Sequence, residues 1–276
     1  MDISATTRLL TLLGDPVAHS FSPVFQNAAI RHAGHNAVYT ALRCDAQSVA
    51  PLIRALCRGG GGGNVTVPHK HAAAQCIERP TDAVTRTGAC NTFWGEDGII
   101  CGDNTDVIGF RRAVEAMIGS LQDTHTLIVG AGGAAAAAVC ALLDGGAERI
   151  TLLNRSPDRA GHLAARFAGG DTVIDVVTTV AALHDRDLDL VVNASTVGLA
   201  DHEPLPLDLS VPGRAGAAFD MVYRRDGTTP WVRHATRLGI PVADGVEMLL
   251  GQGAAAFERW FGPPAPLDVM RKALAR

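Results

Sequence analysis

The fold of the second half of the chain is decided by the stretch from Thr124 to Ser156, THTLIVGAGGAAAAAVCALLDGGAERITLLNRS. It reads as an apolar strand, a glycine turn, an alanine-rich helix and a second apolar strand. The turn matches G-x-G-x-x-A in the strand-to-helix setting that this motif requires. Small residues at Gly130, Gly132 and Ala135 allow a tight turn, close approach of a pyrophosphate and close packing of helix on strand. We therefore predict a dinucleotide site at Gly130, Ala131, Gly132, Gly133 and Ala134, with the phosphates at the helix N-terminus. A plain tight turn is the alternative.

The end of the second strand indicates which dinucleotide is bound. An NAD site usually has an acidic residue there to hold the ribose hydroxyls. This chain has Asn154, Arg155 and Ser156 instead. A guanidinium suits a 2'-phosphate, and Arg159, one turn further on, adds a second one. Either arginine alone could be an ordinary surface charge, but the absence of the acid beside them favours NADP.

Working outward, the rest of the chain alternates strand and helix patterns. The first hundred residues read LLTLLG, SPVFQNAAIRHAG, AVYTALRC, SVAPLIRALCRG, NVTVP and HKHAAAQCIE. Repeated strand–helix units predict a mainly parallel α/β sheet. A connecting helix over 107–117 follows, and DLDLVVNAS and GAAFDMVY add two buried strands after the glycine turn. A helix over 246–260 and a last helix beyond Gly262-Pro263-Pro264 are expected to fold back on the first lobe.

These patterns predict an α/β protein of two lobes. An N-terminal, mainly parallel α/β substrate domain over 1–106 is completed by C-terminal helices within 243–276. A Rossmann-type dinucleotide-binding domain occupies 107–242. The length of 276 residues suits two domains of ordinary size.

Composition excludes several classes of protein. The chain is 47% hydrophobic and 19% charged, which excludes a disordered protein. A net charge of -4 leaves no basic stripe for nucleic acid or an anionic membrane, so we expect a small-molecule substrate. The expected assembly is a monomer or homodimer, a choice that the sequence leaves open. MDISATTRLL has no secretory pattern, which predicts a cytoplasmic protein. The apolar stretch 126–147 is mostly Gly and Ala and reads as strand, loop and helix rather than as a membrane span.

We expect no metal and no disulfide framework. The six cysteines contain no C-x-x-C pair and do not alternate with histidine, so free buried thiols are predicted. His69 and His71, and likewise His32 and His35, are spaced as metal ligands could be. Neither pair has a third ligand nearby.

Lysine is rare in this chain. Of 24 basic residues only Lys70 and Lys272 are lysines. Pro68 is a natural first helical residue, which places Lys70 in the first turn of a helix. The helix dipole disfavours a cation there and tends to lower its pKa, which suits proton exchange near neutral pH. We therefore predict a functional role for Lys70, with a surface lysine as the alternative.

Several polar residues admit both a local and a functional role. Asp103 and Asp106 lie just before the connecting helix, where Asp106 or Asn104 could be an N-cap. Ser22 before Pro23 also fits an N-cap. Ser20 has no such explanation. Asn91 and Gln252 would suit a polyol ligand, but each could be a cap or a buried polar group.

Eight motifs in order, HSFSP, NVTVPHK, GACNT, GDNTD, GAGGA, NRS, DMVY and ADGVEMLLGQGA, together resemble the shikimate dehydrogenases over nearly the whole chain. The resemblance implies a Rossmann-type NADP lobe, a substrate lobe and an active site in the cleft. It implies NADPH-dependent reduction of 3-dehydroshikimate to shikimate in chorismate and aromatic amino-acid biosynthesis. It implies that Ser20 and Ser22 bind the substrate carboxylate, that Lys70 and Asp106 are the catalytic pair, that Thr66, Asn91, Tyr223 and Gln252 line the pocket, and that Met221 and Gly245 contact the cofactor.

The chemistry agrees with these residues. Ketone reduction needs a hydride and a proton for the developing alkoxide, so one positioned acid/base suffices. We assign that task to Lys70, with Asp106 holding it; the sequence leaves open which of the two transfers the proton. Departures from the family pattern are Ala135-Ala136 in place of a Ser-Arg pair, which predicts weaker NADP binding, and Arg224-Arg225 after the tyrosine. NASTVGL, from Asn193, resembles the loop near the nicotinamide.

Rival functions remain at this point. A sister enzyme acting on quinate or an amino analogue would use the same lysine and aspartate. The serine pair, Ser20 and Ser22, and the GDNTD segment argue against a folate-type dehydrogenase. The presence of both Lys70 and Asp106 argues against a catalytically silent NADP-binding module.

Overall fold

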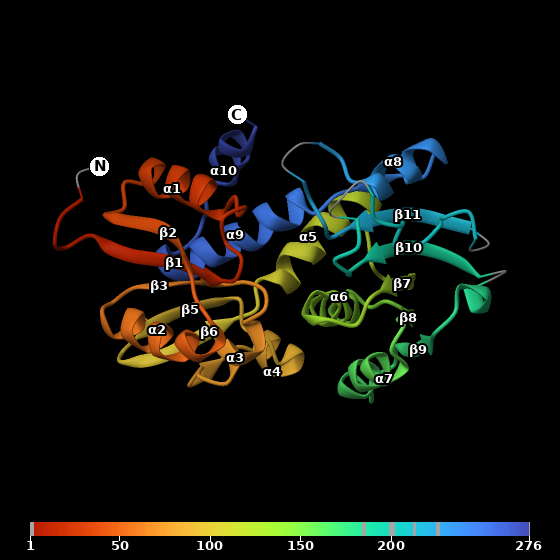
Figure 1. Ribbon diagram of the computed structural model, residues 1–276, viewed down its shortest axis with the longest axis horizontal. Coiled ribbons are helices and arrows are strands. Elements are labelled where there is room, and N and C mark those ends of the chain that lie inside the picture. The colour runs from red at the N-terminus through yellow and green to blue at the C-terminus, as the bar shows by residue number, and fades with distance from the viewer. Residues whose placement is uncertain (1–2, 184–185, 199–201, 212–213, 225–226, 276) are drawn as a thin grey trace. The chain divides into compact units, whose positions relative to one another are not determined.

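The computed structural model describes residues 3–183, 186–198, 202–211, 214–224 and 227–275 and divides the chain into two units (Figure 1). Unit 1 consists of Met1–Gly109 and Leu250–Arg276, and unit 2 of Phe110–Leu249. The chain passes from unit 1 to unit 2 within helix α5 (Asp106–Ile118) and returns within helix α9 (Val246–Phe261). The two divisions therefore fall inside helices.

Unit 1 is built on a six-stranded sheet in the order β2-β1-β3-β5-β6-β4. Its other elements are β1 (Arg8–Gly14), α1 (Ser22–His32), β2 (Ala37–Arg43), α2 (Ala46–Arg58), β3 (Gly62–Val65), α3 (Lys70–Ala74), β4 (Arg79–Pro80), α4 (Asp82–Thr87), β5 (Thr92–Glu96), β6 (Ile99–Asp103) and α10 (Leu267–Leu274). The pairs β1–β2, β1–β3 and β4–β6 are parallel, whereas β3–β5 and β5–β6 are antiparallel. The α/β class is confirmed, and the sheet is mixed rather than built from parallel units alone.

The β5–β6 hairpin was not predicted from the sequence. Its turn contains Asp97 and Gly98, which both have positive φ, 51° and 78°. An Asp-Gly pair between apolar strands is the signal for such a two-residue turn, because its backbone twist matches that of the strands. The hairpin ends at Asp103 and so delivers the chain to the start of α5.

The glycine run before Asn64 lets β3 fit into the middle of the sheet. A Cβ atom at Gly63 would overlap the carbonyl oxygen of Thr11, and one at Gly62 would lie 2.6 Å from that of Phe93. Larger residues would push the neighbouring strands apart. The last two glycines of the run, Gly62 and Gly63, therefore belong to a central strand.

The two faces of this sheet are covered differently. α2, α3 and α4 lie on one face, over a core that includes Leu13, Ile53 and Phe93 (Figure 1). The C-terminal helices belong to the same unit, since the indole Nε1 of Trp260 donates to the Phe93 carbonyl (3.2 Å). The Gln26 amide of α1 donates to the Gly253 carbonyl of α9 (2.8 Å). The prediction that these helices fold back on the first lobe is confirmed.

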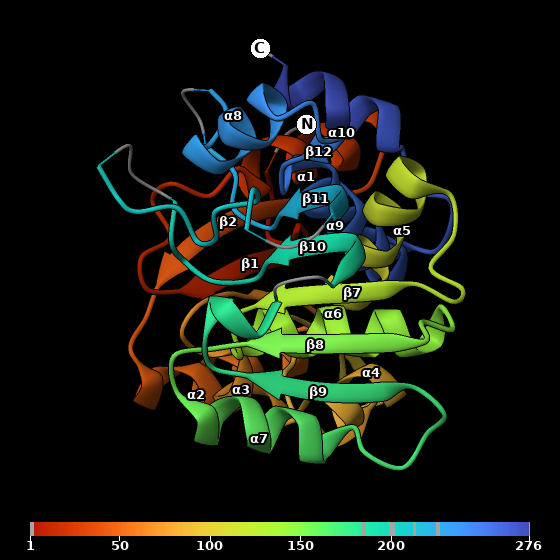
Figure 2. The ribbon, with the colours of Figure 1, turned by 90° about the vertical axis from the view of Figure 1, so that its right-hand side faces the viewer.

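The described residues of unit 2 form a six-stranded sheet, parallel throughout, in the order β12-β11-β10-β7-β8-β9 (Figure 2). Its elements are β7 (His125–Val129), α6 (Gly133–Asp144), β8 (Arg149–Leu153), α7 (Pro157–Arg166), β9 (Val173–Val177), the 3₁₀ helix η1 (Val180–Leu183), β10 (Asp187–Asn193), β11 (Arg214–Asp220), α8 (Pro230–Arg237) and β12 (Val242–Ala243). This is the doubly wound order of dinucleotide-binding folds, whose two halves meet where β7 lies beside β10. The predicted Rossmann-type lobe is confirmed.

Apolar side chains alternate across this sheet. Ala218 of β11 packs in one core with Trp231 of α8. The next residue, Phe219, meets Phe110 of α5 edge-on, with ring centroids 5.6 Å apart. Successive strand residues point to opposite faces, so both faces of the sheet are covered by helices.

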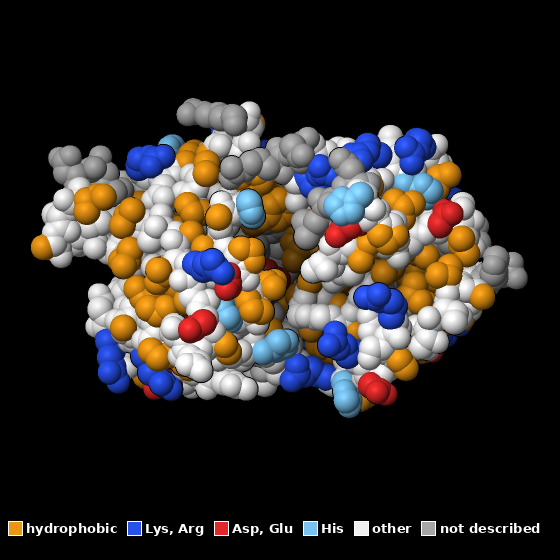
Figure 3. All heavy atoms as spheres, in the orientation of Figure 1, with side chains coloured by type: hydrophobic (Ala, Val, Ile, Leu, Met, Phe, Trp, Pro, Cys, Tyr) orange, Lys and Arg blue, Asp and Glu red, His pale blue; other side chains and the backbone are white. Residues whose placement is uncertain are grey.

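On the face shown in Figure 3, basic and acidic side chains of the described residues are interspersed. None of the described helices combines the length and the apolar character that crossing a membrane requires.

Candidate active site

Lys70 and Asp106 form the centre of the candidate site in unit 1. Lys70 is the first residue of α3 and Asp106 the first of α5. The Nζ of Lys70 lies 2.5 Å from Oδ2 of Asp106, and the two side chains are 21% and 9% exposed. An ion pair so little exposed to water is held firmly, yet the lysine remains within reach of a ligand.

The start of the helix differs from the expected one. Pro68 was predicted as its first residue, but α3 begins at Lys70, after His69. The reason is local, because the His69 N–H donates back to the Thr66 carbonyl (2.9 Å) and closes a turn ahead of the helix. The prediction that Lys70 lies in the first turn is nevertheless correct.

The alternative N-cap roles of Asp106 and Asn104 are wrong. The second oxygen of Asp106, Oδ1, accepts a hydrogen bond from Nδ2 of Asn91 (2.8 Å). Asn104 donates its amide to Thr87 (2.9 Å), and its Oδ1 has no partner among the described residues. Both carboxylate oxygens of Asp106 are thus committed to side chains from other parts of the unit.

Asn91 and Gln252 join this pair. Nδ2 of Asn91 lies 3.4 Å from Oε1 of Gln252, which α9 contributes from the far end of the chain. The Thr105 hydroxyl lies 3.5 Å from the same Gln252 oxygen. The structure therefore brings together Lys70, Asn91, Asp106 and Gln252, four residues that the sequence analysis singled out.

The two carboxylates of the GDNTD segment have different surroundings. Asp103 accepts from Thr81 Oγ1 (2.7 Å) through one oxygen and from Arg259 Nε and Nη2 (both 2.9 Å) through the other. Arg259 belongs to α9, so this pair ties the C-terminal helix to the end of β6. Sequence reasoning missed Arg259, because nothing local to it indicates a partner 156 residues away.

The serine pair lies at the start of α1. Ser22 is the first residue of that helix and Phe21 is its N-cap, so the N-cap role considered for Ser22 is wrong. The backbone N–H of Ser22 donates to Oγ of Ser20 (3.1 Å), which gives Ser20 a local role that was not anticipated. Thr66 follows β3, where its N–H donates to the Leu13 carbonyl (2.8 Å).

The glycine turn of unit 2 has the geometry that a pyrophosphate requires. Gly130 has a φ of +116°, and a Cβ there would lie 3.0 Å from the Ala194 carbonyl oxygen. Gly132 is exposed, and a Cβ there would meet nothing within 4 Å. Gly132 is also the N-cap of α6, so free amide groups surround this open position, with Ala131, Gly133 and Ala134 beside it. The turn lies at the carboxyl end of β7, where such sheets bind their ligands.

The end of β8 fits a phosphorylated ribose. Arg155 and Arg159 are exposed, and neither has an ion pair within the described part of the chain. Nδ2 of Asn154 donates to the Ser156 carbonyl (2.9 Å) and shapes the loop between them. Two guanidinium groups, and no carboxylate at positions 154–156, suit a 2'-phosphate; Asp158 lies between the two arginines, in the first turn of α7.

A third group of predicted site residues in unit 2 lies at the carboxyl ends of β10 and β11. The Met221 N–H donates to the Asn193 carbonyl (3.0 Å), and the Gly245 N–H donates to that of Val222 (3.2 Å). A Cβ at Gly245 would overlap the Met221 carbonyl and lie 3.3 Å from the Tyr223 ring. These three predicted residues are therefore neighbours. Of the Arg224-Arg225 pair and the NASTVGL loop, Arg225 and Leu199 lie outside the described residues.

Asp220, which the sequence analysis did not identify, anchors that region. Its carboxylate accepts from Thr229 Oγ1 (2.6 Å), Asn193 Nδ2 (2.9 Å) and the Val222 N–H (3.1 Å). Burial raises the pKa of Asp220, and these donors only partly oppose the effect. It is a structural group that holds β10, β11 and the N-terminus of α8 together.

The histidines and cysteines have structural surroundings. His69 Nε2 lies 2.8 Å from the Cys44 carbonyl, and His71 Nδ1 2.8 Å from that of Gly88. His35 stacks on Phe261 at 4.1 Å. All six cysteines are buried, as predicted, and they form no disulfide among the described residues.

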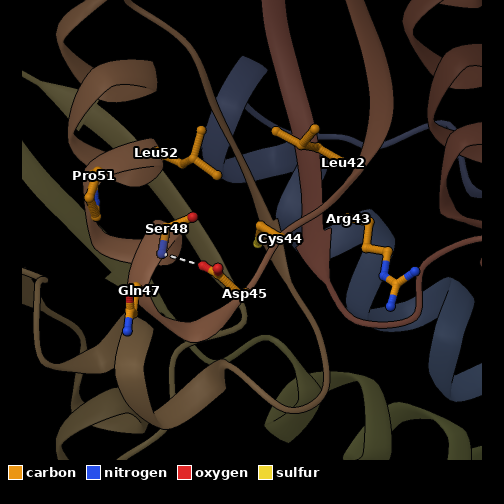
Figure 4. Close-up of a pocket in the computed structure, with 8 residues that line it drawn as sticks. All are labelled: Leu42, Arg43, Cys44, Asp45, Gln47, Ser48, Pro51 and Leu52. Atoms are coloured by element: carbon orange, nitrogen blue, oxygen red, sulfur yellow. Dashed lines mark hydrogen bonds between the residues drawn. The ribbon is translucent and has the colours of Figure 1, made fainter.

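A separate hollow of about 590 Å³ lies where β2 runs into α2 (Figure 4). It is lined by Leu42, Arg43, Cys44, Asp45, Gln47, Ser48, Pro51 and Leu52. Its charged groups serve the fold, because Asp45 caps α2 through the Ser48 N–H (2.9 Å) and Arg43 pairs with Asp15 (2.7 Å). None of the predicted site residues lines it.

Comparison with known proteins covers most of the chain. The model "Shikimate dehydrogenase substrate binding domain" matches residues 12–93, "Shikimate / quinate 5-dehydrogenase" residues 112–205, and "Shikimate 5'-dehydrogenase C-terminal domain" residues 245–275. The shikimate dehydrogenase (NADP(+)) of Moorella thermoacetica is 38% identical over 282 residues, which cover 99% of this chain and 95% of that protein.

Solved structures agree with this result. The shikimate dehydrogenase of Aquifex aeolicus superposes with a TM-score of 0.91 at 33% identity, over 100% of both chains. The shikimate 5-dehydrogenase of Thermus thermophilus, in complex with NADP(H) and shikimate, has a TM-score of 0.87 at 34% identity, covering 97% of this chain and 98% of that one. The chain therefore belongs to the shikimate dehydrogenase family.

Proposed function

We propose that this protein reduces 3-dehydroshikimate to shikimate with NADPH, in the pathway to chorismate and the aromatic amino acids. The observation that carries the proposal is the Lys70–Asp106 ion pair (2.5 Å), set beside the amides of Asn91 and Gln252. The NADP(+)-dependent relatives that match nearly the whole chain support the same reaction.

The Lys70 ammonium is proposed to supply the proton. NADPH, when bound, supplies the hydride to the carbonyl carbon. As charge develops on the carbonyl oxygen, the Lys70 ammonium donates a proton to it and is left as a neutral amine. Its side chain is 21% exposed, so water can restore the proton afterwards. Asp106 holds the Lys70 Nζ in place through their ion pair.

The remaining predicted residues divide between the two units. In unit 1, Ser20 and Ser22 are proposed to bind the substrate carboxylate and Thr66, Asn91 and Gln252 the ring hydroxyls. Tyr223, which belongs to unit 2, is proposed as a further substrate contact. Hydrogen-bonding side chains of these kinds discriminate strongly against analogues that leave one of them unpaired.

Unit 2 is proposed to hold the cofactor. Residues 130–134 would bind the pyrophosphate at the α6 N-terminus, Arg155 and Arg159 the 2'-phosphate, with Asn154 and Ser156 shaping their loop, and Met221 and Gly245 the nicotinamide end. We further propose a cytoplasmic location, which suits six buried cysteines that form no disulfide among the described residues.

The test is a grid of steady-state turnover measured by nicotinamide absorbance. The grid crosses 3-dehydroshikimate, shikimate, quinate and aminoshikimate with NADP(H) and NAD(H). Turnover confined to the shikimate pair with NADP(H) is expected. Preferred turnover of quinate or aminoshikimate, or a preference for NAD(H), would contradict the corresponding part of the proposal. Tight NADPH binding without any turnover would indicate a silent binding protein.

A further inference from the structure

A run of buried polar side chains leads from β2 to the catalytic pair. The Tyr39 hydroxyl donates to Oδ1 of Asn64 (2.8 Å), and Nδ2 of Asn64 donates to the Asn91 carbonyl (3.0 Å) and to Thr92 Oγ1 (2.9 Å). Tyr39 is 2%, Asn64 5% and Thr92 0% exposed. Polar groups this deeply buried are retained only where their hydrogen bonds are satisfied, and here they form one connected network.

The direction of these hydrogen bonds is determined by the backbone. The Asn91 carbonyl can only accept, so the amide group that faces it must be Nδ2 of Asn64. Oδ1 of Asn64 therefore faces Tyr39, and the tyrosine hydroxyl must be the donor. Burial raises the pKa of Tyr39, more than a hydrogen bond with Ser22 lowers it, so the hydroxyl keeps its proton.

The same reasoning fixes Asn91. The Thr105 N–H can only donate, and it lies 2.8 Å from Oδ1 of Asn91. The Thr92 hydroxyl accepts a hydrogen bond from Nδ2 of Asn64 and donates one to the same Oδ1 of Asn91 (2.9 Å). Nδ2 of Asn91 is left to donate to Oδ1 of Asp106 (2.8 Å). Each donor in the run therefore points towards Asp106, whose other oxygen holds Lys70.

We propose that Tyr39 and Asn64 are positioning residues of the reaction: they hold Asn91 through both its carbonyl and, by way of Thr92, its side chain, and thereby aim one Asp106 oxygen at Lys70. This inference rests on the proposed function. It assigns a task to two residues that lie outside the group around Lys70. A displaced Asn91 would let the Asp106 carboxylate rotate, and Lys70 would lose its alignment with the substrate.

The test compares Tyr39→Phe with Thr11→Val. Thr11 lies on β1, is 2% exposed and has a hydroxyl with no partner among the described residues, so its loss removes a buried hydroxyl from the same sheet but not from the network. We expect kcat of Tyr39→Phe to fall about tenfold and its pH profile to shift, with KM for NADPH unchanged. Thr11→Val is expected to match the wild type. A lower melting temperature with unchanged kcat and pH profile would show that Tyr39 only supports the fold.

A second pair of variants covers the case in which Tyr39→Phe does not fold. Thr92→Val removes the hydroxyl that joins Asn64 to Asn91, whereas Thr92→Ser keeps it. Loss of kcat in the first and recovery in the second is expected. Equal activity of the two would overturn the proposal.

A readout independent of turnover separates this inference from the proposed function. Hydrogen exchange of the Asn91 side-chain amide, followed by NMR, is expected to be faster in Tyr39→Phe than in Thr11→Val. If the wild type reduces none of the substrates but exchange is faster in Tyr39→Phe, the proposed function is refuted and the positioning of Asn91 is supported. Unchanged exchange would refute the positioning itself.

Discussion

Replacing Lys70 by methionine tests the proposed chemistry most directly. Methionine keeps an unbranched side chain of similar length but cannot transfer a proton or pair with Asp106. Loss of a positioned acid/base lowers rates by about 10²–10⁴, which corresponds to about 2.7–5.4 kcal/mol of transition-state stabilisation. We expect a fall of this size in kcat. Binding of NADPH should change less than about twofold, because Lys70 does not belong to the dinucleotide turn.

Lys70→Met should also have a lower free energy of unfolding, because Asp106 loses its ion-pair partner. Asp106 is 9% exposed and loses one of its two side-chain partners, while the amide of Asn91 remains. Breaking a fully buried pair costs about 3–5 kcal/mol, and the remaining amide and the partial exposure of Lys70 reduce this to about 1–3 kcal/mol. A modestly lower melting temperature is therefore expected, with a folded protein at 25 °C.

The chain provides a matched control. Lys272, the only other lysine, is exposed in the last turn of α10. Lys272→Met makes the same chemical change outside the site and should leave kcat unchanged. Stopped-flow single turnovers with NADPH separate the chemical step from product release. If Lys70→Met turns over at the wild-type rate in that measurement, Lys70 is not the proton donor.

Three further predictions concern unit 2. In steady-state assays, Arg155→Ala should raise KM for NADP+ about 10–100-fold through loss of a charge-assisted contact, and should leave KM for NAD+ nearly unchanged. The control variant Arg237→Ala, on the exposed surface of α8, should change neither KM. Gly130→Ala forces a side chain onto a φ of +116° and against Ala194, so calorimetry should show a lower melting temperature and fluorescence titration a loss of NADPH binding; Gly161→Ala, in open space on α7, should do neither. Because burial raises the pKa of Asp220 above its ordinary value of 3.8, its contribution to stability is complete below that value and is lost as the pH rises through the raised pKa. The unfolding free energy of the wild type, relative to Asp220→Asn, should therefore grow as the pH falls from 7 towards 4 in urea titrations, and a constant difference would contradict this.

The parts of the fold that the sequence predicted are those with local signals. The strand, turn and helix around Gly130 were predictable because each uses a short-range pattern, an apolar strand followed by small residues. The β5–β6 hairpin has its signal in Asp97 and Gly98, but the strand–helix alternation on both sides of it favoured parallel units. The glycine run at 59–63 was visible only as low complexity. That its last two residues, Gly62 and Gly63, lie in a central strand was not predictable, because the atoms that crowd them belong to Thr11 and Phe93.

The site was predictable as a set of residue types and not as a network. Lys70 stood out because lysine is rare here, and Asp106 because it precedes a helix. The local alternatives were settled only by partners far away in the sequence. Asp106 could be an N-cap until Asn91 and Lys70 were found on its oxygens. Tyr39 reads as an ordinary strand residue, since the hydroxyl that sets it apart is paired 25 residues away, with Asn64.

The return of the C-terminal helices to unit 1 has a consequence for the order of synthesis. Unit 2 is one continuous segment, 110–249, whereas unit 1 needs both 1–109 and 250–276. The sheet of unit 1 leaves the ribosome before unit 2, but Gly253, Trp260 and the Arg259 partner of Asp103 leave it after unit 2. Domains tend to fold as units as they emerge from the ribosome. Unit 2 starts later in the chain than unit 1, but it is fully synthesised before unit 1 is. The nascent β1–β6 sheet must therefore remain without α9 and α10 until unit 2 and the helices that follow it have been synthesised.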